Sequence, residues 1–164
     1  MSEERTLSIT TPTDVEVTMT RDFRAPRALV WKAITEAEHL QEWMLGPPGW
    51  TMPVCEIDLR PGGAWHFVWR KTDGEEMGMR GEYREIDPPD RLVHTESWGE
   101  GWPETLVTQV LTERDGVTTL AATIHYPSKE ERDRALATGM ADGAAMSYDR
   151  LDGLVRAMAE GART

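Results

Sequence analysis

The stretch that decides the fold runs from Ser128 to Met158 and reads SKEERDRALATGMADGAAMSYDRLDGLVRAM. Ser128 is followed three residues later by Glu131, which is the capping box typical of a helix start. Apolar and small residues then recur at the spacing of one helix face, so we predict a single helix of about thirty residues. This face consists of Leu136, Met140, Ala144, Ser147, Leu151, Val155 and Met158.

Most of the chain before this helix alternates between apolar and polar residues, as strands with one solvated face do. Short turns rich in Gly, Pro and Asp separate the alternating runs, which predicts an antiparallel sheet. We expect strands over residues 14–23, 51–59, 65–70, 77–86, 91–98, 106–112 and 118–126, and short helices over 26–35 and 36–43.

An antiparallel sheet must cover one of its faces, and the final helix is the only predicted element long enough to do so. We therefore expect an α+β fold in which a curved sheet wraps around the C-terminal helix. No repeat, low-complexity tract or linker interrupts the pattern. The simplest organisation is a single domain over residues 14–160, preceded by an N-terminal extension over residues 1–13.

Charge and composition disfavour several partners. The formal net charge of -11 disfavours binding to nucleic acid and to anionic membranes. No apolar run approaches the roughly 18 residues of a membrane span, and no apolar signal segment follows Met1 to Arg5. A single cysteine, Cys55, permits no internal disulfide. We therefore expect a cytoplasmic protein without nucleic-acid or membrane partners.

Seven segments carry a family resemblance. They are RAPRALVWKA (24–33), EWMLG (42–46), DLRPGGAW (58–65), DGEEMGMRG (73–81), EIDPPDRLV (85–93), GMADG (139–143) and SYDRL (147–151). In this order, they resemble the START-like (SRPBCC) superfamily over roughly residues 14–158, and within it the activator of heat-shock-protein-90 ATPase homologue family. The resemblance implies the helix-grip (Bet v 1-like) fold, with a curved antiparallel sheet of about seven strands around the C-terminal helix and two short helices after the first strand.

The chain contains seven Trp and nine Met but only two Phe. These residues either fill the core or line a pocket between sheet and helix. Gly143 either leaves room beside such a pocket or only permits close packing of helix and sheet. The residues that we expect to line a ligand pocket are Trp43, Trp50, Trp65, Phe67, Trp69, Met77, Met79, Gly81, Tyr83, His94, Glu96, Trp98, Met140, Gly143, Ala144 and Ser147.

His94 and Glu96 are the candidates for chemistry. Strand alternation places them on one face with Leu92 and Trp98, so a concave orientation would point two ionisable groups into an apolar pocket. The alternatives are a satisfied polar pair, or the opposite orientation with both groups in solvent.

Signatures of other chemistry are missing from the sequence. No nucleophile elbow, phosphate loop, dinucleotide fingerprint or zinc motif occurs. The four histidines lie on different predicted elements without the spacing of metal ligands. We expect neither a metal nor a cofactor.

Three functions follow. The first is a non-catalytic domain that binds an apolar small molecule in the pocket. The second, implied by the resemblance alone, is a module that binds a heat-shock-protein-90-type chaperone. The third is a cyclase or hydrolase acting on a polyketide-like substrate with His94 and Glu96 as acid and base, as the chemistry of other START-like members implies.

Overall fold

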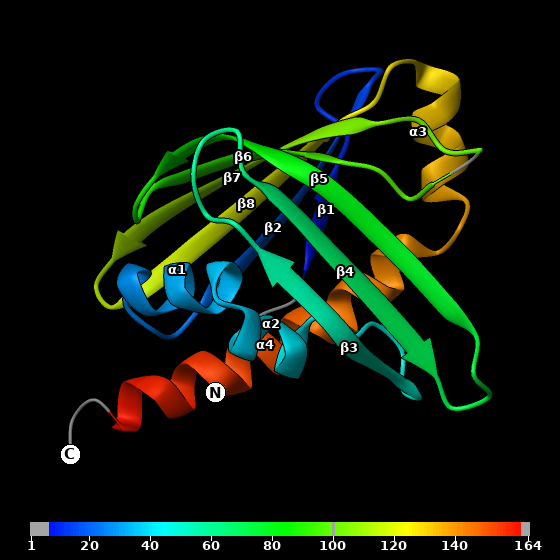
Figure 1. Ribbon diagram of the computed structural model, residues 1–164. Helices are drawn as coiled ribbons and strands as arrows, with labels where there is room; N and C mark the ends of the chain where they lie inside the picture. Colours follow the sequence, from blue (N-terminus) through cyan, green and yellow to red (C-terminus); the bar gives the residue numbers. More distant parts are fainter. Residues whose placement is uncertain (1–6, 100, 162–164) are drawn as a thin grey trace.

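The computed structural model describes residues 7–99 and 101–161, which form an eight-stranded antiparallel sheet and four helices (Figure 1). The strand order across the sheet is β1-β2-β8-β7-β6-β5-β4-β3. The elements are β1 (Ser8–Thr10), β2 (Glu16–Phe23), α1 (Arg27–Thr35), α2 (Ala37–Trp43), β3 (Trp50–Ile57), β4 (Ala64–Lys71), β5 (Glu76–Asp87), β6 (Arg91–Glu96), β7 (Thr105–Arg114), β8 (Val117–His125), α3 (Lys129–Leu136) and α4 (Met140–Gly161).

The sheet curves around α4, which runs along its concave side (Figure 1). Helices α1 and α2 contact α4 and cover one end of the sheet, whereas α3 lies toward the other end. This arrangement confirms the predicted α+β helix-grip fold. It also makes the space between sheet and α4 the place where any enclosed site must lie.

The sheet has one strand more than the sequence pattern predicts. Strand β1 lies within the segment expected to be an N-terminal extension, and it pairs antiparallel with β2 through Ser8 and Thr20. A strand of three residues is too short to show a recognisable alternation in the sequence. Strand β1 is identified by its pairing with β2.

The predicted single helix from Ser128 to Met158 is wrong in one respect, because it is two helices. Its start is as expected, since the Ser128 hydroxyl accepts a hydrogen bond from the Glu131 N–H at 3.2 Å. Gly139, however, adopts a φ of 81° between α3 and α4. This left-handed conformation, which glycine tolerates best, ends helices. The apolar periodicity continues through the break and hides it.

The solid part of the core lies on the side of α4 that carries Leu151 and Val155, both completely buried. Val17 and Phe23 of β2 and Val30 of α1 are also completely buried. They follow the alternation of β2 and the helical spacing of α1 and α4, so local pattern and tertiary packing agree.

A buried arginine fixes α4 to the sheet. Arg21 lies in the inward-facing row of β2, is only 6% exposed, and extends over the Phe23 ring at 5.1 Å. Its guanidinium donates to the Tyr148 carbonyl at 3.2 Å and to the Asp149 carboxylate at 3.1 Å. One side chain thereby sets the height of the middle of α4 above the sheet.

The loop after α2 fixes the same turn of α4 from the opposite side. The Ser147 hydroxyl accepts a hydrogen bond from the Gly46 N–H at 2.9 Å. The Arg150 guanidinium donates to the Gly46 carbonyl at 2.7 Å. Ser147 and Arg150 flank the turn that Arg21 contacts. Helix α4 is therefore held between β2 on one side and this loop on the other.

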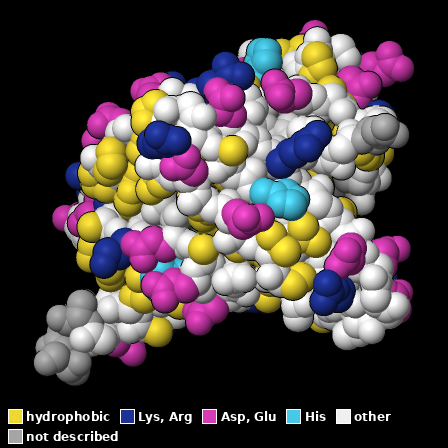
Figure 2. Space-filling model, in the orientation of Figure 1, with side chains coloured by type: hydrophobic (Ala, Val, Ile, Leu, Met, Phe, Trp, Pro, Cys, Tyr) yellow, Lys and Arg dark blue, Asp and Glu magenta, His cyan; other side chains and the backbone are white. Residues whose placement is uncertain are grey.

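Acidic and basic side chains are interspersed on the molecular face in Figure 2. Several form exposed ion pairs, such as Arg70 with Glu76 at 2.7 Å, and such pairs contribute little stability. Within the described ranges, no helix combines the length and apolar character required to cross a membrane.

Gly81 provides a test of the strand packing behind the site. A Cβ at Gly81 would collide with the Thr95 carbonyl oxygen and lie 2.7 Å from the Trp65 ring. We expect Gly81→Ala to lower the free energy of unfolding by about 3 kcal/mol through overpacking. Gly78→Ala, in the same strand, is the matched control because its Cβ would lie 3.8 Å from the Phe67 carbonyl oxygen. Urea unfolding followed by circular dichroism measures both, and equal midpoints would contradict this packing.

Candidate functional site

A cavity of about 730 Å³ lies between the concave face of the sheet and the first half of α4. Strands β4, β5 and β6 supply one wall, and α4 and the loop after α2 supply the opposite wall. The turn of α4 that Arg21 and Gly46 hold in place borders it.

The predicted pocket residues converge on this cavity. All of them line it except Gly81. Gly81 instead has no side chain, which lets the Trp65 ring and the Thr95 carbonyl oxygen lie close to its backbone. That the lining residues contact a ligand stays a prediction. The lining residues among those predicted are Trp43, Trp50, Trp65, Phe67, Trp69, Met77, Met79, Tyr83, His94, Glu96, Trp98, Met140, Gly143, Ala144 and Ser147.

His94 lies deep in the cavity wall. Its ring packs edge-on against Trp65, with centroids 5.4 Å apart, and its Nδ1 lies 3.2 Å from the Thr95 carbonyl oxygen. Burial lowers its pKa, and this outweighs the hydrogen bonds to Thr95 and Gln109 that favour the charged form. The imidazole is therefore neutral at pH 7 and adds no positive charge to the cavity.

Glu96 is the acidic group of the cavity interior. Burial raises its pKa to about 7, against which a hydrogen bond with the Trp98 side chain acts. The side chain is half-buried and lines the cavity. At neutral pH the group is therefore divided between its acid and its carboxylate.

Two tyrosines lie near Glu96 and were not among the predicted site residues. Burial raises the pKa of both Tyr126 and Tyr148 to about 12, and the negative charge of Glu96 adds to this effect. The Tyr126 hydroxyl lies 3.6 Å from the Met140 sulfur. Tyr126 continues the inward-facing alternation of β8. Tyr148 lies four residues after Ala144, on the same face of α4. The sequence therefore contained a signal for each tyrosine.

One mouth of the cavity lies at the break between α3 and α4, where the lining residues are exposed. Thr138, Gly139 and Asp142 line it from this break, and Trp102 lines it from the segment before β7. The Arg134 guanidinium stacks on the Trp102 ring at 3.9 Å. The helix break that the apolar periodicity concealed is thus also what shapes the opening.

The cavity can hold an apolar molecule with one polar group near Glu96, and its described lining residues include no paired acid and base. His94 bonds to Thr95 and Gln109, whereas Glu96 bonds to Trp98. Cys55, the one thiol, does not line the cavity, and burial raises its pKa to about 11. Its thiol is consequently protonated and poorly nucleophilic at pH 7.

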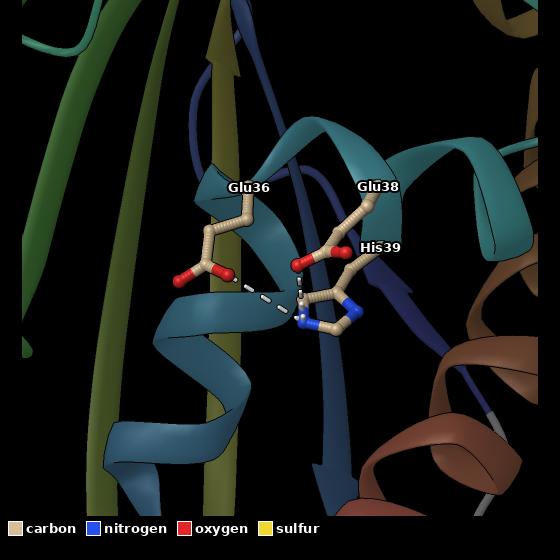
Figure 3. A group of neighbouring side chains, drawn as sticks. All are labelled: Glu36, Glu38 and His39. Carbon is tan, nitrogen blue, oxygen red and sulfur yellow. Dashed lines mark ion pairs between the residues drawn. The ribbon is translucent and has the colours of Figure 1, made fainter.

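Three side chains of the types that bind metal ions, Glu36, Glu38 and His39, lie together outside the cavity at the start of α2 (Figure 3). His39 Nε2 lies 3.6 Å from a Glu36 oxygen and 3.9 Å from a Glu38 oxygen. The carboxylates therefore already have the imidazole as a partner. We assign no metal to this cluster.

Comparison with known proteins identifies the family. The family model described as activator of Hsp90 ATPase homolog 1-like protein matches residues 24–156. This chain belongs to that family. No protein with a curated description matches the chain significantly.

Solved structures agree with membership of this AHSA1-like family. A crystallised protein from Rhodobacter sphaeroides is 31% identical, with a TM-score of 0.85, covering 92% of this chain and 98% of that chain. Protein NE0264 from Nitrosomonas europaea, 23% identical, shares the fold with a TM-score of 0.80 over 90% of this chain and 98% of its own. An AHSA1-like protein from Aeromonas hydrophila, 16% identical, does so with a TM-score of 0.65 over 80% and 90%.

The raised pKa of Glu96 makes a prediction about the stability of this AHSA1-like domain. Its pKa of about 7 in the folded state exceeds the usual 4.5, so the unfolded chain releases the proton first as pH rises. Glu96 therefore lowers the free energy of unfolding progressively as the pH rises from about 4.5 to about 7. We expect Glu96→Gln to raise the free energy of unfolding by about 2 kcal/mol at pH 8, and by much less at pH 5.

Urea unfolding at both pH values measures this difference. Glu75→Gln, in the exposed turn before β5, is the matched control and should leave stability nearly unchanged at either pH. A benefit of Glu96→Gln that is equal at pH 5 and pH 8 would show that the carboxyl group does not titrate as described.

Proposed function

We propose that this domain binds an apolar small molecule in the cavity between the sheet and α4, without transforming it. The observation that carries the proposal is a cavity of about 730 Å³ whose wall is mostly aromatic, aliphatic and thioether side chains. Ligand pockets typically span about 300–1,000 Å³ and combine such walls with a few polar groups.

The energetics of packing support the same conclusion. Protein interiors are close-packed, and empty apolar space costs the dispersion contacts that a neighbouring atom would supply. Large rings border this cavity and could have filled it had the helix lain closer. The hydrogen bonds of Arg21 and Gly46 hold the helix where it is instead. A space maintained in this way favours an occupant.

Filling the cavity from α4 tests the proposal. Ala144→Phe places a ring into the cavity, so we expect it to abolish binding of an apolar fluorescent probe such as N-phenyl-1-naphthylamine. Ala157→Phe is the matched control, because Ala157 is exposed on the same helix and does not line the cavity. It should bind like the unaltered protein.

Fluorescence titration measures the affinities, and circular dichroism establishes that each variant is folded. Equal binding by the two folded variants would place the probe elsewhere, and would remove the support for an internal ligand site.

A chaperone-binding role is the second candidate, and the description of the matched family favours it. It predicts that the purified domain binds an Hsp90-type chaperone and changes its ATPase rate. The ligand-binding proposal predicts neither effect. A pull-down with an ATPase assay separates the two.

An enzymatic role draws support from the pKa of Glu96, which suits proton transfer near neutral pH. For a polyketide-like substrate, His94 and Glu96 would serve as the acid and base. Such a role predicts turnover that His94→Ala abolishes while the domain stays folded.

A further inference from the structure

Glu96 lies in a cavity whose described lining residues offer it no cationic partner. Neither Lys nor Arg occurs among them, and the carboxyl group forms no ion pair with either type within residues 7–99 and 101–161. The Trp98 side chain hydrogen-bonds to it, and Tyr126 and Tyr148 line the same cavity. An ionised carboxylate in such surroundings is costly unless a positive charge pairs with it.

Aromatic rings line the same cavity. Trp98, which hydrogen-bonds to Glu96, stacks on Trp69 with centroids 5.6 Å apart. Tyr148 stacks on Trp43 at 5.9 Å. The faces of Trp and Tyr rings attract cations. A carboxylate in a cavity lined by such rings is therefore suited to a ligand ammonium group.

The cavity offers little to an anionic ligand. His94 is neutral because burial lowers its pKa, and a second carboxylate, Asp142, lines the mouth. Arg134 stacks on Trp102 and pairs with Glu131 at 3.3 Å, and it does not line the cavity. The formal net charge of -11 also favours the approach of cations over anions.

We propose that the ligand is an apolar organic cation: its protonated amino group pairs with Glu96 while its hydrophobic body fills the aromatic cavity. This inference rests on the proposed ligand-binding function and adds the charge of the ligand to it. It distinguishes an apolar amine from a neutral molecule and from a fatty-acid-like anion.

Three probes with one ring skeleton test the inference: naphthalene-1-methylamine, naphthalene-1-methanol and 1-naphthoate. Isothermal titration calorimetry at pH 8 measures their affinities for the full chain. We expect the amine to bind about tenfold more tightly than the alcohol, as a charge-assisted hydrogen bond to a buried partner implies. The naphthoate should bind most weakly.

Glu96→Gln should remove the preference for the amine and leave the affinity for the alcohol within about twofold, because the glutamine retains the shape and loses the charge. Glu75→Gln, the exposed control, should retain the preference. In the unaltered protein the amine should bind more weakly at pH 5.5 than at pH 8, since its partner carboxylate becomes protonated. Glu96→Gln should show no such change.

Among the described groups that line the cavity, we attribute the expected pH dependence of amine binding to Glu96. Tyr126 and Tyr148 ionise far above pH 8, since burial raises the pKa of each to about 12. His94 is held neutral by its lowered pKa. Asp142 at the mouth is exposed to solvent, and Asp142→Asn therefore accompanies Glu96→Gln. It should leave the pH dependence in place.

The outcomes separate the two proposals. If the alcohol matches the amine, if the naphthoate binds most tightly, or if Glu96→Gln has no effect on the amine, the inference about charge is overturned while ligand binding stands. If none of the probes binds, or if Ala144→Phe leaves the binding of all three unchanged, both proposals are overturned.

Discussion

The bond between Arg21 and α4 is the constraint on which the rest of the structure depends. A guanidinium in the inward row of β2 reaches the Tyr148 carbonyl and the Asp149 carboxylate, and so sets how far the helix stands from the sheet. On the side of Leu151 and Val155 the remaining space is closed by packed side chains. On the side of Ala144 it stays open, so one contact divides the domain into a packed half and a hollow half.

The hollow half of the domain lowers its stability, as the pKa shifts of the polar groups in the cavity indicate. Burial raises the pKa of Glu96 and lowers that of His94, and both effects oppose charge in a space that no described Lys or Arg lines. Perturbed pKa values of this kind cluster at functional sites. The stability lost near Glu96 is consistent with the common trade between a stable core and a site prepared for a ligand.

The fold was largely predictable because its determinants are local: alternation marks the strands, and the capping box at Ser128 marks the start of the last helical region. Most of the cavity wall followed from the same alternation, including the orientation of His94 and Glu96. The break at Gly139 was not predictable, since the apolar spacing continues across it. Gly81 does not line the cavity, because the Trp65 ring and the Thr95 carbonyl oxygen lie against it, which only the three-dimensional structure shows.

The division of the domain into a packed half and a hollow half explains why the chain is rich in Trp. Trp and Tyr have two side-chain torsions, so they build large rigid walls at a low entropic cost. Trp43 gains rigidity because its indole donates to the Ala33 carbonyl at 2.8 Å, and Trp69 because its indole donates to the Met44 carbonyl at 2.7 Å. Rings held at their edges by hydrogen bonds keep their places in the cavity wall rather than collapsing into the cavity. Flexible aliphatic side chains of equal volume would lack these bonds, so the same residues that define the cavity also keep it open.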